Sequence, residues 1–164
     1  EYQSSPYFSV DSELGIPVWH RVDLARLLVL DYCLKEKPDA VSVYCDFDVH
    51  DVKLQTSGFC KILEKNGFVI GATLDPQNEL RLENGYIAIT AKQAELLSRL
   101  RDGIYAATAS GVMSERNDVF NSYRDTLILF CKEREIDINS VLLHVLEPCT
   151  YQLPRKDQYL GISV

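Results

Sequence analysis

The stretch Ala40 to Asp51, AVSVYCDFDVHD, constrains the fold most, because apolar and polar residues alternate along it. In a β-strand, successive side chains point to opposite faces. We therefore predict a strand over residues 40–49, with its apolar face (Val41, Val43, Cys45, Phe47 and Val49) toward the core. The other face is expected to be wet, which is typical of an antiparallel sheet.

The polar face of this strand carries the clearest candidate for chemistry. Asp46, Asp48 and His50 follow one another at alternate positions, and Asp51 comes next. Carboxylate oxygens hold Mg²⁺ or Mn²⁺ in many hydrolases and phosphotransferases. Asp46, Asp48 and His50 are therefore the candidate catalytic and metal-binding residues. Same-face neighbours in a strand lie roughly 6.5–7 Å apart, so one ion would need a bend or another ligand.

The Asp-x-Asp after an apolar strand resembles the beginning of haloacid-dehalogenase-type phosphatases. The resemblance is limited to this stretch, because no later lysine and acidic pair fits the rest of the family's pattern. The competing interpretation is structural: a solvated strand face followed by a helix cap.

Length and charge limit the classes of function. A chain of 164 residues suggests one domain, with an N-terminal arm over 1–16 and an α+β domain over 17–164. The net charge of −7 argues against nucleic acid and anionic membranes, since phosphate binding depends on clustered Lys and Arg. It is compatible with a basic protein partner or simply with solubility.

The cysteines and the hydropathy of the sequence favour a reducing cytoplasm as the cellular compartment. Five cysteines are scattered without a Cys-x-x-Cys pair, so we expect free, mostly buried thiols in a reducing cytoplasm. The sequence contains no run of about 18 apolar residues, so no membrane span is expected. A signal peptide removed before Glu1 stays an open alternative.

The first expected helix runs from Pro17 to about Lys37, where Pro38 stops it. Its apolar residues cover most of its circumference, which is wider than the stripe of a surface helix. This predicts a central helix covered on several sides, or a homo-oligomer interface through residues 18–36. A second helix ends at Asn66, with Gly67 as its left-handed cap.

A β-meander is expected next. Phe68 to Leu74 forms one strand, residues 75–78 a turn, and 79–90 a hairpin whose two strands meet at Asn84-Gly85, a strong type I′ turn signal. Alternating residues place three charged side chains on one face of this hairpin. That face is the candidate partner-binding surface: Glu79, Arg81 and Glu83.

Helices dominate the remaining chain. Thr90 and Gln93 have the spacing of a capping box, Gly103 and the small residues after it predict a broken helix, and Asn117 begins another. Residues 141–146 fit either a strand or a helical turn, and 159–164 fit an edge strand. The expected fold class is α+β, with an antiparallel sheet of four to five strands packed against about four helices.

Two main functions are compatible with these patterns. The first is a small acidic protein-binding module without a cofactor, such as an immunity or inhibitor protein that neutralises a basic partner. The alternative is a hydrolase or phosphotransferase that uses Mg²⁺ or Mn²⁺ at Asp46, Asp48 and His50. A homo-oligomeric structural or regulatory module is the third possibility.

Overall fold

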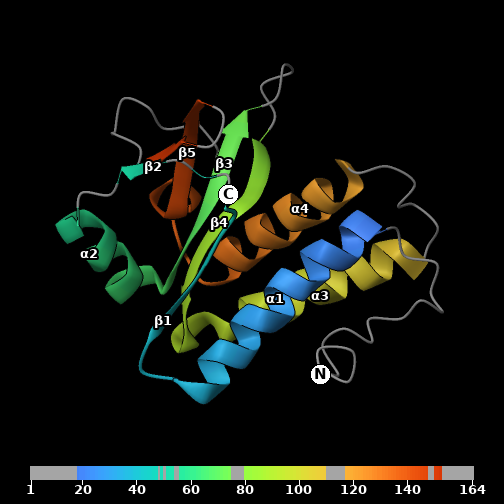
Figure 1. Ribbon diagram of the computed structural model, residues 1–164, viewed down its shortest axis with the longest axis horizontal. Helices are drawn as coiled ribbons and strands as arrows, with labels where there is room; N and C mark the ends of the chain where they lie inside the picture. The colour runs from blue at the N-terminus through green and yellow to red at the C-terminus, as the bar shows by residue number, and fades with distance from the viewer. Residues whose placement is uncertain are drawn as a thin grey trace.

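The computed structural model describes residues 18–47, 49, 51–53, 56–74, 80–109, 117–147 and 150–152, and it has the expected α+β class (Figure 1). Its helices are α1 Val18–Glu36, α2 Thr56–Asn66, α3 Ala94–Ala109 and α4 Asn117–Glu133. Its strands are β1 Val41–Cys45, β2 Asp51–Lys53, β3 Phe68–Leu74, β4 Leu80–Thr90, β5 Leu142–Glu147 and β6 Thr150–Gln152. The short 3₁₀ turns η3 Ala91–Gln93 and η4 Ile138–Val141 precede α3 and β5.

The sheet is mixed, and the prediction of a purely antiparallel sheet is wrong. Its strand order is β1-β4-β3-β5-β6-β2, with two short strands of three residues each at and beside one end. The pairs β3–β5 and β2–β6 are parallel, and the other neighbours are antiparallel. A parallel pair needs a long connection. The connection from β3 to β5 consists of β4, α3 and α4.

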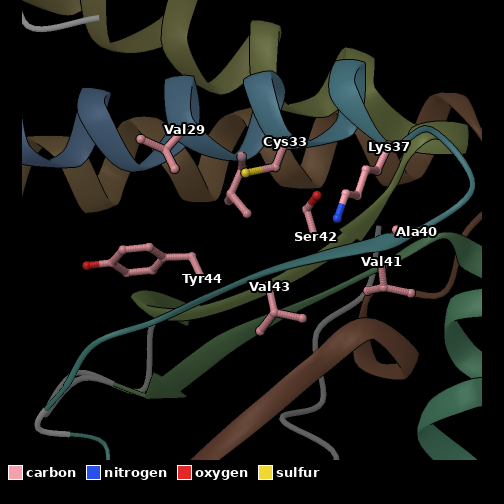
Figure 2. Close-up of a pocket in the computed structure, with 9 residues that line it drawn as sticks. Val29, Cys33, Lys37, Ala40, Val41, Ser42, Val43 and Tyr44 are labelled. Carbon is pink, nitrogen blue, oxygen red and sulfur yellow. The ribbon is translucent and has the colours of Figure 1, made fainter.

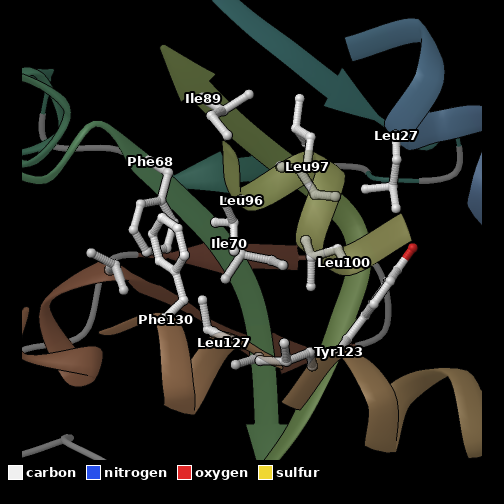
Figure 3. Close-up of a cluster of buried hydrophobic side chains, with 14 of the residues drawn as sticks. Leu27, Phe68, Ile70, Ile89, Leu96, Leu97, Leu100, Tyr123, Leu127 and Phe130 are labelled. Atoms are coloured by element: carbon white, nitrogen blue, oxygen red, sulfur yellow. The ribbon is translucent and has the colours of Figure 1, made fainter. Parts of the chain in front are cut away.

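Helices α1, α3 and α4 cover one face of the sheet, and the main core lies between them and the strands (Figures 1 and 3). Phe68 of β3 meets Phe130 of α4 edge to face, with ring centroids 6.0 Å apart. The Arg134 guanidinium lies over the Phe130 ring, 3.8 Å from its centroid. The expectation of about four helices against the sheet is confirmed for the described residues.

Helix α2 packs on the opposite face and closes a second, smaller core. Leu63 of α2 is buried there with Val69, Tyr86, Ala88 and Leu143 from three strands. The predicted cap at the end of α2 is confirmed, because Gly67 has φ +81° and its N–H donates to the Leu63 carbonyl.

The capping box predicted at Thr90 and Gln93 is absent. The Thr90 hydroxyl donates to the Gly67 carbonyl at 3.0 Å, and the Gln93 amide donates to the Asn66 carbonyl at 2.9 Å. Thr90 makes no side-chain cap for η3. Both side chains instead tie the start of α3 to the turn between α2 and β3.

The predicted hairpin over 79–90 is also wrong, because β4 is a single strand that continues past Asn84-Gly85. Ile70 of β3 pairs with Ile87, whereas the next residue, Gly71, pairs with Glu83. Asn84, Gly85 and Tyr86 therefore form a bulge toward β3 rather than a turn. The real hairpin joins β3 to β4, with Leu74 opposite Leu80, and its connection, 75–79, lies outside the described residues.

Two further helix and strand expectations have clear outcomes. Helix α3 continues unbroken past Gly103, where an added Cβ would lie 2.8 Å from the Ser122 hydroxyl oxygen of α4. The glycine thus permits a close helix crossing instead of a break. Residues 142–147 form a strand after the 3₁₀ turn at 138–141, which resolves the alternative left open by the sequence. The segments 1–16 and 159–164 lie outside the described residues.

The expected burial of the cysteines is largely wrong. Among the described residues, Cys33, Cys45 and Cys60 are exposed thiols, and Cys131 is buried. Burial raises the pKa of the Cys131 thiol to about 12, with Asp137 adding to the effect. None of the described helices has the length and hydropathy needed to cross a membrane.

Candidate protein-docking surface

Strand β1 turns its faces opposite to the predicted way. Val41 and Val43 are 43% and 50% exposed, whereas Ser42 is 7% exposed. Figure 2 shows Ser42 on the side of β1 that faces α1, with Val41 and Val43 on the other side. The apolar face predicted to be in the core is thus the face open to solvent.

The neighbouring elements explain this inversion. Opposed residues in an antiparallel pair share a face, so Ser42 lies beside Ile89 and Val43 beside Ala88. Ile89 belongs to the core under α1, α3 and α4, and Ala88 belongs to the smaller core under α2. Helix α2 packs over β3, further into the sheet, so Val43 at the sheet edge stays half exposed.

A groove lies between α1 and β1 (Figure 2). Its volume is about 250 Å³, and Val29 and Cys33 of α1 form one wall. Tyr44 and the rest of β1 form the other wall, and Lys37 lies at the end where the chain turns from helix to strand. The groove is lined mainly by apolar groups and opens beside the exposed valines of β1.

The outer side of α1 extends this apolar surface. Val22, Val29 and Tyr32 are each more than two-fifths exposed, although Leu24, Leu27, Leu30 and Leu34 on the inner side are buried. Helix α1 contacts both α3 and β1, but these three residues are exposed, so the expectation of a helix covered on several sides is confirmed only in part. A homo-oligomer interface through 18–36 stays a prediction.

A polar network fixes α1 to the bulge in β4. The Asn84 amide donates to the Asp23 carboxylate, and its carbonyl oxygen accepts a hydrogen bond from Arg26. Arg26 and Asp23 also form an ion pair at 3.2 Å. The Tyr123 hydroxyl of α4 donates to the Asp23 backbone carbonyl at 3.4 Å. Because Asn84 and Asp23 are buried, these contacts satisfy groups that would otherwise be costly to bury.

The same arginine reaches the end of β1. Its guanidinium lies 5.0 Å from the Tyr44 ring centroid and forms a 3.2 Å ion pair with Asp46. The Tyr44 hydroxyl donates to the same Asp46 oxygen. Burial, together with this hydrogen bond to a carboxylate, raises the pKa of Tyr44 to about 12. Arg26 therefore joins both ends of the network and holds β1 against α1.

Among the described strands, none pairs with the outer edge of β1. The Asp46 N–H donates to the Gly85 carbonyl, so residue 46 points its backbone groups toward β4. These groups alternate in direction along an antiparallel strand. Ser42 and Tyr44 therefore also point toward β4, whereas Val41 and Val43 point their N–H and C=O groups outward. Because β1 ends the strand order, those outward groups face away from the sheet.

The candidate metal site is only partly described. Asp46 follows β1 directly and contacts Arg26 and Tyr44, as above. The predicted strand over 40–49 is too long, because β1 ends at Cys45. Asp51 begins β2, at the opposite end of the sheet from β1. Asp48 and His50 lie outside the described residues, and within those described no three His, Cys, Asp or Glu side chains group closely enough to hold a metal ion. The metal site stays a prediction.

The candidate charged surface is described in part as well. Arg81 and Glu83 lie on β4, are both partly exposed, and approach each other to 3.5 Å. Glu79 lies outside the described residues. Their role in binding a partner stays a prediction.

The comparisons with known proteins add no identity. No protein-family model, curated protein or solved structure matches this chain.

Sequence reasoning missed the surface that the structure exposes. The alternation in β1 correctly separated its two faces, but it could not say which face meets a helix. One signal was present: the first helix is apolar around most of its circumference. A helix of this kind with only one inner side must expose apolar residues on the other.

Proposed function

We propose that this chain is a small acidic protein-binding module. Its docking surface consists of the outer edge of β1 with Val41 and Val43, and of the adjoining Val29 of α1. The single observation that carries the proposal is the exposure of these three apolar side chains on and beside an edge strand. We call this region the β1 docking surface.

An edge strand rarely exposes several apolar residues without protection. Edge strands are normally protected by charges, prolines, bulges or a covering element, because an open edge binds other strands. Residues 40–45, AVSVYC, contain no charge and no proline. Contiguous apolar patches of this kind mark interaction sites. The polar network at Arg26 keeps the surface in place, so binding requires little rearrangement.

The charge of the chain favours a basic partner. With 24 acidic and 17 basic residues, the net charge is −7, which accelerates encounter with a positively charged protein. An immunity or inhibitor protein acting in a reducing cytoplasm on a basic toxin or nuclease has these properties. The contact itself is apolar, so the charge contributes mainly to the rate of association and to specificity.

Quantitative capture of binding proteins by the immobilised chain tests this function. Wild type is compared with Val43→Lys and with Leu129→Lys, because Leu129 on α4 is equally exposed, at 54%. We expect a basic protein that binds wild type and Leu129→Lys, loses binding to Val43→Lys, and binds more weakly as salt is added. The purified partner must show the same differences in binding among wild type, Leu129→Lys and Val43→Lys. Equal binding by all three variants would contradict the proposed surface.

A further inference from the structure

The groove between α1 and β1 has an apolar body and a polar end (Figure 2). Val29 and Leu30 of α1 line the body together with Tyr44 of β1, and Leu30 is only 2% exposed. Lys37 and Ser42 line the end where the chain passes from helix to strand. A few polar groups in an otherwise apolar pocket are typical of a small-molecule site, because they fix the orientation of the ligand.

The polar end of the groove presents hydrogen-bond donors. Ser42 is 7% exposed, and Figure 2 shows its hydroxyl and the Lys37 side chain directed into the space between α1 and β1. The backbone carbonyls nearest this end already accept hydrogen bonds: that of Cys33 from the Lys37 N–H at 3.0 Å, and that of Lys37 from the Ala40 N–H at 3.1 Å. A ligand group placed here therefore meets an ammonium and a hydroxyl.

The charge at this end complements an anion. Lys35, two residues earlier, forms an ion pair with Asp31 at 2.6 Å, whereas the Lys37 side chain lines the groove. Glu36 and Asp39, the exposed acids beside Lys37 in the sequence, lie outside the groove lining. A carboxylate accepts hydrogen bonds through both oxygens, and charge-assisted bonds of this kind are the strong ones.

The size of the groove limits the length of the apolar part of the ligand. Its volume is about 250 Å³, below the roughly 300–1,000 Å³ of sites for drug-sized molecules. A water-sized group occupies roughly 30 Å³ in a liquid, so the groove has room for about eight such groups. A methylene group is of similar size.

We propose that the α1–β1 groove binds an aliphatic carboxylate of about eight carbons, sized by this volume. The carboxylate lies at Lys37 and Ser42, and the alkyl chain lies along Val29 and Leu30. This inference goes beyond the protein-binding function, because a small molecule occupies the groove and no protein partner is needed for its binding.

Cys33 provides a reporter for the test. Its exposed thiol lines the groove, whereas Cys60, also exposed, lies on α2 outside it and serves as an internal control. The rate of alkylation by iodoacetamide is measured for each cysteine of the full chain by peptide mass spectrometry, with octanoate added up to millimolar concentration. We expect octanoate to slow alkylation of Cys33 saturably, by at least about threefold, because it covers the thiol, and to leave Cys60 unchanged.

The same measurement with 1-octanol and two lysine variants tests recognition of the carboxylate. In wild type, 1-octanol should shield Cys33 less well than octanoate. Lys37→Gln should raise the half-saturating concentration of octanoate about tenfold and that of 1-octanol by less than about twofold. Lys35→Gln, on the same helix end but outside the groove, is the matched control and should change neither.

Three results would overturn the inference: no shielding of Cys33 by octanoate, equal shielding by 1-octanol in wild type, or an unchanged octanoate response in Lys37→Gln. Each is distinct from failure of the proposed function, because the capture experiment measures a protein partner in the absence of octanoate.

Discussion

Strands β1 and β4 are neighbours in the sheet, but their surroundings differ on one face. Both alternate in polarity or size, and five residues of each pair in one antiparallel ladder. In β4, Ile87, Ala88 and Ile89 are all buried, because helices cover both faces of the sheet at that point. In β1, only the side beneath α1 is covered, and Val43 on the other side is half exposed.

This difference shows that the position of an apolar residue in the sheet decides whether it stabilises the fold or is available for binding. A valine or isoleucine contributes to stability when the neighbouring layer covers it, and it becomes available for binding when the layer ends. One strand spacing, roughly 4.8 Å, separates these two situations here. The predictions that follow test this contrast, beginning with the largest expected effect.

The strongest test compares truncations in the two strands. Ile87→Ala should lower the free energy of unfolding by about 3 kcal/mol, because it leaves a cavity between the sheet and its helices. Val43→Ala should lower it by less than about 0.5 kcal/mol, since the side chain is already half in water. Urea denaturation of dilute protein measures both values. Similar losses in the two variants would show that β1 is covered as fully as β4.

The bulge in β4 provides the second test. Asn84→Ala leaves the buried Asp23 carboxylate and the Arg26 guanidinium each without one hydrogen-bond partner, so we expect a loss of about 2 kcal/mol in unfolding free energy. Asn121→Ala, at an exposed position on α4, is the matched control and should change it by less than about 0.5 kcal/mol. A loss no larger than in the control would mean that the network does not hold the bulge.

Alkaline pH tests the connection between β1 and α1. The pKa of Tyr44 is raised from 10.0 to about 12 in the folded protein, so its contribution is full below pH 10 and is lost as pH rises toward 12. Tyr44→Phe should cost about 1 kcal/mol at neutral pH and should flatten the decline across that window. Tyr86 and Cys131, whose pKa values are also raised, are common to both proteins. A parallel decline in the two proteins would contradict this role, and Tyr105→Phe on α3 serves as the control.

The smallest expected effect concerns metal ions. Since the Asp46 carboxylate already contacts Arg26 and Tyr44, Mg²⁺ or Mn²⁺ should leave the melting temperature unchanged. A bound ion would instead stabilise the fold by about 2.7 kcal/mol at a hundredfold excess over its dissociation constant. Such a rise, absent in Asp46→Asn, would favour the alternative of a metal-dependent hydrolase or phosphotransferase.

Local signals in the sequence were sufficient for several elements. Pro17 and Pro38 bracket α1, which spans Val18–Glu36, and Gly67 ends α2 in the left-handed conformation that was predicted. These features depend on the backbone of a few consecutive residues. They therefore do not require knowledge of what packs against them.

Predictions from local sequence signals were wrong where tertiary contacts oppose those signals. Asn84-Gly85 is a strong turn sequence, yet the Asn84 side chain bonds to Asp23 and Arg26, and β4 continues on both sides of it. Gly103 has the sequence of a helix break, yet α4 packs closely against it and α3 continues. In each case, partners from a distant segment stabilise the conformation that local propensity disfavours.

By itself, the sequence determined the α+β class, the extent of the first helix and the separation of two faces in β1, because each depends on periodicity or on a local backbone preference. Only the tertiary structure decided which face of β1 is covered, where β4 pairs and that no described strand pairs with the apolar outer edge of β1. The physical reason is that alternation fixes the relative direction of side chains, whereas burial depends on which layer lies opposite them, and that layer comes from residues far away in the chain.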